Sequence, residues 1–330
     1  MRFLGRLLSI VLGLVVAAGG AAFWWINQPI RLATPMLELS IEPGTSARGV
    51  AQDVVGAGVL TSPQLLYWWF RLSGDARQIK AGSYELSGDL TPRSLLAKLV
   101  RGEEALRAVT LVEGLTFTQF RQTLLKAEQL TPDTQGLTTD AIMQKLGLPG
   151  VAPEGRFYPD TYTYTKGSSD LAVLRRAQHA MQRHLDAAWQ LRTADSPLKT
   201  PDELLTLASI IEKETGLASD RPMIASVFTN RLRIGMMLQT DPTVIYGMGD
   251  KFDGNLRRRD LQTDTPWNTY TRAGLPPTPI AMPGKAALLA AAQPAQSRAL
   301  YFVARGDGGS QFSETLDAHN RAVAKYQLGR

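Results

Sequence analysis

The sequence predicts an α+β protein made of a single apolar helix, a small α+β module and a larger mixed α/β domain. The chain opens with an uncharged apolar run about as long as a bilayer-spanning helix. Short alternating segments bounded by Pro-Gly, Ser-Pro and Thr-Pro pairs follow, which is typical of a small α+β fold. Beyond them helical periodicity dominates, and 330 residues suffice for two domains besides the first helix.

The apolar run covers residues 7–26, LLSIVLGLVVAAGGAAFWWI, and we expect it to span a membrane. Arg2 and Arg6 precede it, so residues 1–6 should stay in the cytoplasm and the rest of the chain should cross. A cleaved signal peptide is the alternative, because Ala-Gly-Gly-Ala-Ala suits a peptidase. The length of the run, and the interfacial residues Trp24 and Trp25 at its end, favour a retained anchor.

Residues 27–35 contain two prolines and are predicted to form a short stalk. In residues 36–105 we expect a strand at 36–42, a helix capped by Thr45 or Ser46, a helix at Ser62-Pro63, a strand at 82–86, and a helix from Thr91-Pro92 to Gly102. This order resembles a LysM-like module of the kind that holds glycan chains. A small α+β spacer is the alternative, since a fold does not establish a function.

Residues 106–330 form the predicted larger domain. We expect a strand at 107–113, helical structure over 115–148, an aromatic loop at 153–162 and a helix over 170–191. A strand at 300–304, a Gly-rich turn at 306–309 and a last helix should complete the sheet of this domain.

Composition excludes several classes of chemistry. There are no cysteines and only three histidines, without metal-ligand spacing, so we expect neither a metal site nor a cofactor. The net charge is +6, but the basic residues are scattered and lack a nucleic-acid-binding fold around them. We therefore interpret runs such as residues 257–259 as solvated surface and expect no nucleic-acid partner.

One helix carries the strongest candidate for catalysis. Thr200-Pro201 begins it, Gly216 is placed to end it, and Glu212 and Glu214 fall in its last turn. Two residues apart, these carboxylates point about 160° away from each other, so they cannot act as a close pair. Glu214 lies about 60° from the centre of the apolar stripe, and we expect it to face the protein body.

A carboxyl at the negative end of a helix, partly screened from water, is harder to ionise. Its pKa should rise, so that Glu214 keeps a proton near neutrality and can act as a general acid. The alternative is an ordinary ion pair or a solvated helix end, and the spacing alone does not distinguish the two.

Longer motifs surround this glutamate in a fixed order. They are ASIIEKET at 208–215, VFTNRLRIGMMLQTDPTVIY at 227–246, NTY at 268–270 and GLPPTPI at 274–280. Together they resemble the YceG-like family of endolytic murein transglycosylases, over nearly the whole chain from about Met36. In that family the second glutamate of Glu-Lys-Glu is catalytic, which implies Glu214 here. One departure is Met282, where a polar residue is expected, and it puts a substrate contact there in doubt.

The resemblance implies cleavage of the β-1,4 bond between N-acetylmuramic acid and N-acetylglucosamine inside a peptidoglycan strand, leaving a 1,6-anhydro end and terminating strand elongation. Polar residues in the motifs are candidates for binding sugar amides and hydroxyls, although each could instead hold loop backbone. They are Asn230, Gln239, Asp241, Asn268 and Tyr270.

The implied partners are glycan strands, the membrane and peptidoglycan synthases, with the catalytic domain on the periplasmic side of the cell inner membrane. Two other functions stay open. The chain could be a membrane-tethered glycan-binding scaffold without activity, or a lysozyme-like muramidase that uses the same site with water.

Overall fold

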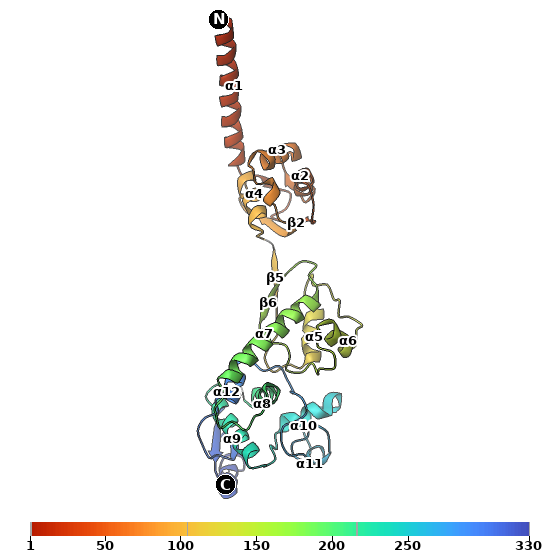
Figure 1. Ribbon diagram of the computed structural model, residues 1–330, viewed down its shortest axis with the longest axis vertical. Coiled ribbons are helices and arrows are strands. Elements are labelled where there is room, and N and C mark those ends of the chain that lie inside the picture. Colours follow the sequence, from red (N-terminus) through yellow and green to blue (C-terminus); the bar gives the residue numbers. More distant parts are fainter. Residues whose placement is uncertain (1, 104, 216, 330) are drawn as a thin grey trace. The chain divides into compact units, whose positions relative to one another are not determined.

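The structure is a computed structural model that describes residues 2–103, 105–215 and 217–329, with the side chains of residues 2–9 outside the described part. It divides into two units. Unit 1 comprises residues 1–107 and 164–166, and unit 2 comprises residues 108–163 and 167–330. Figure 1 shows the order of the elements in both.

Unit 1 contains one long helix and a small α+β module. Its helices are α1 (Arg2–Ile26), α2 (Ala47–Gly56), α3 (Pro63–Leu72), the 3-10 turn η1 (Ala76–Gln78) and α4 (Pro92–Arg101). Its strands are β1 (Arg31–Leu32), β2 (Met36–Ile41), β3 (Val59–Leu60) and β4 (Gly82–Ser87). β1 pairs with β3 and β2 pairs with β4, both antiparallel.

The predicted helix starts in this module are confirmed. Ser46, Ser62 and Thr91 each accept a hydrogen bond from a backbone N–H of the first turn, which satisfies one of the free donors of the helix. α4 ends at Gly102, whose φ of 71° is the left-handed conformation that glycine adopts without strain. Local sequence therefore determines these boundaries.

The segment predicted as a stalk is instead part of the module. Ile30 is buried in its core, and its N–H donates to the carbonyl of Leu90 over 2.6 Å. Arg31 pairs with Leu60 in the β1–β3 sheet. The two prolines of residues 27–35 did not reveal this, because pairing with β3 is a tertiary contact.

The described part of the chain has no helix long and apolar enough to cross a membrane. The predicted span 7–26 begins among residues 2–9, whose side chains lie outside the described part. Within that part, α1 is apolar and exposed: Leu12, Leu14 and Phe23 each show more than 60% of their surface.

Unit 2 is mainly helical. Its helices are α5 (Phe117–Leu125), α6 (Thr139–Lys145), α7 (Asp170–Gln190), α8 (Pro201–Glu214), α9 (Arg221–Arg233), α10 (Asp241–Met248), η2 (Gly249–Lys251), α11 (Arg258–Gln262), α12 (Lys285–Ala292) and α13 (Leu316–Tyr326). The strands are β5 (Leu106–Thr110), β6 (Thr161–Thr165), β7 (Tyr301–Ala304) and β8 (Ser310–Ser313). The boundary between the units runs through β5 and β6, which pair with each other.

The core of unit 2 forms around α8, which packs against α7, α9, α10 and α12 (Figure 1). Leu204, Leu207, Ala208 and Ile211 are completely buried, as the apolar periodicity predicts. The prediction that the carboxyl-terminal strand completes a larger sheet is wrong, because β7 pairs with β8 alone among the described residues. The aromatic loop also runs into an unpredicted strand, β6, whose pairing partner β5 is some 50 residues away.

Candidate active site

Glu214 is the last residue of α8, the helix around which the core of unit 2 forms. Thr200 caps the first turn by accepting the N–H of Glu203 over 3.2 Å, and Pro201 occupies the first helical position. The helix ends at Glu214, and Thr215 follows in extended conformation. Gly216, predicted to end the helix, lies outside the described residues.

The Glu214 side chain lines a cleft with a volume of about 640 Å³. Its lining residues come from α9, residues 238–241, Tyr270, β7 and α13. The side chains of the cleft that carry polar groups are Glu214, Arg231, Gln239, Asp241, Tyr270, Tyr301, His319, Asn320 and Gln327. Two of these groups are carboxyls, Glu214 at the end of α8 and Asp241 at the start of α10.

The Glu214 carboxyl is held by Thr240, whose hydroxyl donates to Oε1 of the glutamate. Thr240 is the N-cap residue of α10, a position where the hydroxyl ordinarily accepts a bond from the first turn of its own helix. Here it forms no such cap. The hydroxyl is therefore available to orient the Glu214 side chain.

Two further buried threonines fix the backbone of Thr240. The Thr269 hydroxyl accepts the Thr240 N–H over 3.1 Å, and the Thr243 hydroxyl donates to the Thr240 carbonyl over 2.7 Å. The hydroxyls of Thr243 and Thr269 are themselves 2.8 Å apart. The neighbouring Gln239 has a φ of 47°, unusual for a residue with a side chain, and its N–H donates to the Thr269 carbonyl over 3.1 Å.

Burial raises the pKa of Glu214 from 4.5 to about 7, with the charge of Asp241 adding to the rise. The hydrogen bond from Thr240 and the positive charge of Arg231 oppose it. A carboxyl with a pKa near 7 is half protonated at neutral pH, so it can both give and take a proton. This is the property that a single residue needs to serve as acid and then as base.

Arg231 is a buried cation in the cleft wall, with 7% of its surface exposed. Its Nε donates to the Leu300 carbonyl and its Nη1 to the Leu238 carbonyl, each over 2.7 Å. These bonds tie the residues before α10 to the start of β7. Arg231 forms no ion pair within the described residues.

The part of the cleft formed by β7 and α13 contains two aromatic rings. Tyr301 of β7 stacks on His319 of α13 with ring centroids 5.2 Å apart, and the guanidinium of Arg231 lies 5.4 Å from the centre of the Tyr301 ring. Burial and the charge of Arg231 lower the pKa of His319, which keeps its imidazole neutral at pH 7. Flat apolar rings beside polar groups suit the faces and edges of a sugar.

A model of the YceG-like family matches residues 39–325. The chain belongs to the YceG-like family.

Named relatives agree with this assignment. The endolytic murein transglycosylase of Bacillus subtilis (strain 168) is 30% identical over 312 residues, covering 88% of this chain and 84% of the relative. The enzyme of the same name from Streptococcus pneumoniae serotype 2 is 28% identical, and the match covers 87% of this chain but 58% of that protein. A crystal structure of a yceG-like protein from Listeria monocytogenes has a TM-score of 0.57 at 30% identity, covering 87% of this chain and 98% of that one.

Three of the five residues predicted to bind substrate in this YceG-like chain line the Glu214 cleft: Gln239, Asp241 and Tyr270. The Tyr270 hydroxyl donates to Oδ1 of Asp241 over 2.6 Å, which holds the two side chains together. Burial and this neighbouring carboxylate raise the pKa of Tyr270, so the phenol stays protonated and able to donate.

The structure places the other two away from the cleft. Asn230 donates to the carbonyls of Ser297 and Ala299, over 2.9 and 3.0 Å, and holds the chain before β7. Asn268 is completely buried and donates to the carbonyls of Leu261 and Thr263 at the end of α11. Their amides serve loop backbone, the alternative that the sequence left open.

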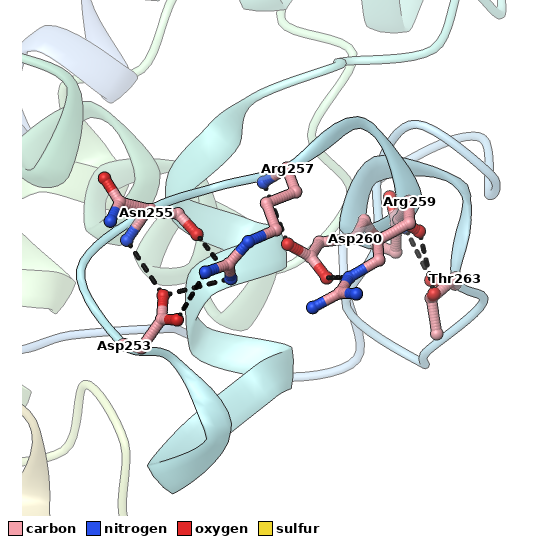
Figure 2. A network of polar contacts seen from close by, with 7 residues as sticks. Asp253, Asn255, Arg257, Arg259, Asp260 and Thr263 are labelled. Carbon is pink, nitrogen blue, oxygen red and sulfur yellow. Dashed lines mark hydrogen bonds and ion pairs between the residues drawn. The ribbon is translucent and has the colours of Figure 1, made fainter.

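The α11 loop that Asn268 holds is also braced by its own charges, as Figure 2 shows. Arg257 forms two hydrogen bonds to the carboxylate of Asp253, over 2.6 and 3.1 Å. Asp260 accepts the N–H of Arg257 over 2.8 Å, and Arg259 lies 3.7 Å from Asp260. The arginines at 257 and 259 are thus partly neutralised within their own loop.

Glu212 and Met282 have structural roles. Glu212 accepts the Gly284 N–H over 2.9 Å and lies 3.8 Å from Arg221, on a different side of α8 from Glu214. Met282 is completely buried, and its backbone pairs with Gly114 and Leu115. The side chain of Met282 does not line the cleft, so its departure from the expected polar residue does not alter the cleft wall.

Sequence reasoning missed Thr240, Arg231, Tyr301 and His319 as parts of the site. Thr240 and Arg231 lie inside the motif at 227–246, next to the predicted residues Asp241 and Asn230, so their place in the sequence could have indicated a role in the site. Tyr301 and His319 come from a strand and a helix far along the chain, and only packing brings them to the cleft. Among the described residues there is no cluster of His, Cys, Asp or Glu that could hold a metal ion.

Replacing Asp241 with Asn is expected to shift the alkaline limb of the pH–rate profile to lower pH, by up to about one unit. The reason is that the Asp241 charge raises the pKa of Glu214, and its removal lets Glu214 ionise earlier. The pH dependence of kcat/KM on glycan strands measures this shift. A limb that stays in place or moves upward would show that Asp241 has no such electrostatic effect.

Glu154 is a second buried carboxyl, outside the cleft. Oε1 accepts the N–H of Phe117 at the start of α5, and burial raises the pKa of Glu154 from 4.5 to about 7. Because this folded-state pKa exceeds that of the unfolded chain, the unfolded state ionises first, and stability falls as the pH rises from about 5 to 7.

We expect Glu154→Gln to remove this loss of stability, since its amide oxygen can still accept the Phe117 N–H. The free energy of unfolding of the wild type should drop by about 1–3 kcal/mol between pH 5 and 8, and that of the variant by less. Denaturant unfolding at the two pH values measures both. Equal drops would mean that Glu154 ionises normally in the folded state.

Proposed function

We propose that this chain is an endolytic murein transglycosylase that cuts the β-1,4 bond between N-acetylmuramic acid and N-acetylglucosamine inside glycan strands. The observation that carries the proposal is the proton-holding Glu214 at the edge of an open, sugar-sized cleft. The relatives named above, at 30% and 28% identity over most of the chain, support the same reaction.

Glu214 supplies both proton transfers. Protonated Glu214 donates to the glycosidic oxygen, so the bond from the anomeric carbon to that oxygen breaks and the N-acetylglucosamine hydroxyl leaves. The carboxylate then removes the proton from the C6 hydroxyl of the muramic acid, whose oxygen bonds to the anomeric carbon. Atoms and charge balance without water, and the product carries a 1,6-anhydro ring.

One carboxylate suffices because the nucleophile belongs to the substrate. The muramidase alternative needs a second carboxylate to activate water or to form a covalent intermediate. Asp241 is the candidate in the cleft wall, but its Oδ1 accepts the Tyr270 hydroxyl and its charge serves to raise the pKa of Glu214. These contacts favour the transglycosylase reaction.

Mass spectrometry of the cut ends tests the reaction. The full chain is incubated with uncrosslinked glycan strands, and the mass of each fragment is measured to identify its new end. We expect 1,6-anhydro-muramic ends in the middle fragments of long strands, as an endolytic cut produces. Reducing muramic ends, heavier by one water, would establish the hydrolase instead.

We propose further that α1 anchors the chain in the cell inner membrane, with the amino terminus in the cytoplasm and the residues after α1 in the periplasm. The exposed apolar side chains between Ile10 and Phe23 support this, as do Arg2 and Arg6 before them. Peptidoglycan strands are the proposed substrate, and peptidoglycan synthases at the same membrane are proposed partners. A cut close to the membrane would terminate the elongation of nascent strands.

The small module of residues 36–105 is proposed to hold glycan near the membrane. The same substrate would then be bound by one unit and cut by the other. Its resemblance to a LysM-like module supports the proposal, and a binding measurement of the full chain with insoluble glycan tests it.

A further inference from the structure

Helix α3 presents a row of large apolar side chains to solvent. Leu65, Trp68 and Leu72 expose 50%, 54% and 78% of their surface, and their spacing of three and four residues places them on one side of the helix. Another side of α3 is completely buried through Leu66 and Phe70. The exposed row is therefore not part of the side of α3 that packs in the core of the module.

Leu60, which lies three residues before α3 begins, is a further apolar side chain with 60% of its surface exposed. Leu60 pairs with Arg31, only five residues after α1 ends at Ile26. Trp25, in the last turn of α1, packs against the core of the module. The strand that leads into α3 thus pairs with the residues that follow α1.

Charge around the row favours an anionic surface. No Asp or Glu occurs between Asp53 and Asp75. Arg31, which pairs with Leu60, and Arg71, which precedes Leu72, are both exposed. The guanidinium of Arg48 lies 5.0 Å from the ring of Tyr67 on α3. Exposed Leu and Trp beside Arg is the composition of helices that lie in the headgroup region of a bilayer.

We propose that α3 lies in the bilayer interface, with Leu60, Leu65, Trp68 and Leu72 in the acyl boundary and with Arg31 and Arg71 at anionic lipid headgroups. This rests on the proposed anchoring by α1 and adds a second membrane contact. If α1 ends in the bilayer interface at Trp24 and Trp25, the part of the module next to the end of α1 lies at the depth of the lipid headgroups. Two contacts fix the orientation of the module against the membrane, whereas a single span would let it rotate.

The absence of cysteine from the chain makes a direct test possible. Single cysteines are introduced as Leu72→Cys, Leu14→Cys and Ser87→Cys, and each is labelled with an environment-sensitive fluorophore in the full chain. The proteins are reconstituted into bilayers that contain phosphatidylglycerol. Ser87 is the exposed polar control at the end of β4.

The label at 72 is expected to shift its emission to the blue in bilayers, to lose its quenching by iodide and to be quenched by nitroxide-labelled lipids. The label at 87 should keep its iodide quenching. Lipid contact at 14 without nitroxide-lipid quenching at 72 would overturn the inference and leave the anchor standing. Retained iodide quenching at 72 would then mean that α3 faces water, and lost iodide quenching would mean that a second copy or another protein covers it. Iodide quenching at 14 would overturn the anchor itself, and with it this inference.

Discussion

Glu214→Gln is expected to abolish the release of anhydro-ended glycan, with a loss of kcat of about 10³-fold or more. The amide has almost the same shape as the carboxylic acid, and its oxygen can still accept the Thr240 hydroxyl. It cannot donate a proton to the glycosidic oxygen or take one from the C6 hydroxyl. Both chemical steps therefore fail while folding and binding are preserved.

Glu212→Gln is the matched control, because it makes the same change two residues earlier on α8. Glutamine there keeps an acceptor for the Gly284 N–H and loses only the charge near Arg221. Activity should stay within an order of magnitude of the wild type, and thermal unfolding should record any loss of stability. An unchanged product yield from Glu214→Gln would remove Glu214 from the mechanism, and no anhydro-ended product from the wild type itself would support the non-catalytic scaffold instead.

Thr240→Val is expected to lower kcat by about 10–100-fold, as expected for one lost hydrogen bond to a charged group. The same change should move the alkaline limb of the pH–rate profile upward by about one unit. The Thr240 hydroxyl stabilises the ionised form and so lowers the pKa of Glu214; without it, Glu214 keeps its proton to higher pH. In the variant, the Glu214 carboxyl is therefore held less firmly, and it ionises only at higher pH.

Thr206→Val is the control for this change, since Thr206 is a buried threonine of α8 that bonds only within the helix, donating to the Asp202 carbonyl over 2.8 Å. It should leave the pH profile in place. The upward shift for Thr240→Val is opposite to the downward shift expected for Asp241→Asn, so a general loss of structure cannot mimic the pair. A downward shift for Thr240→Val would mean that the hydroxyl does not stabilise the carboxylate.

Helix boundaries and the catalytic candidate were predictable because the signals are local. Thr200-Pro201, Ser62-Pro63 and Thr91-Pro92 cap the helices that they were predicted to begin. The orientation of Glu214 toward the body of unit 2 follows from the apolar stripe of the same helix. The direction of its pKa shift follows from the burial that this orientation brings.

The roles of the polar motif residues were not predictable in the same way. Asn230 and Asn268 have the same side chain as sugar-binding residues, yet their donors are used by carbonyls of the loops at 297–299 and 261–263. The identity of an amide residue does not specify its partner. Only the path of the surrounding backbone does.

The sequence by itself determined the family, the start and end of α8 and the side chain that can carry the proton, because caps, periodicity and contiguous motifs are read within a few turns of chain. Only the tertiary structure decided which hydroxyl orients the Glu214 carboxyl and which aromatic rings line the cleft. Thr240 bonds to Glu214, and Arg231, Tyr301 and His319 line the same cleft from three other elements. Their positions depend on packing that local sequence does not record.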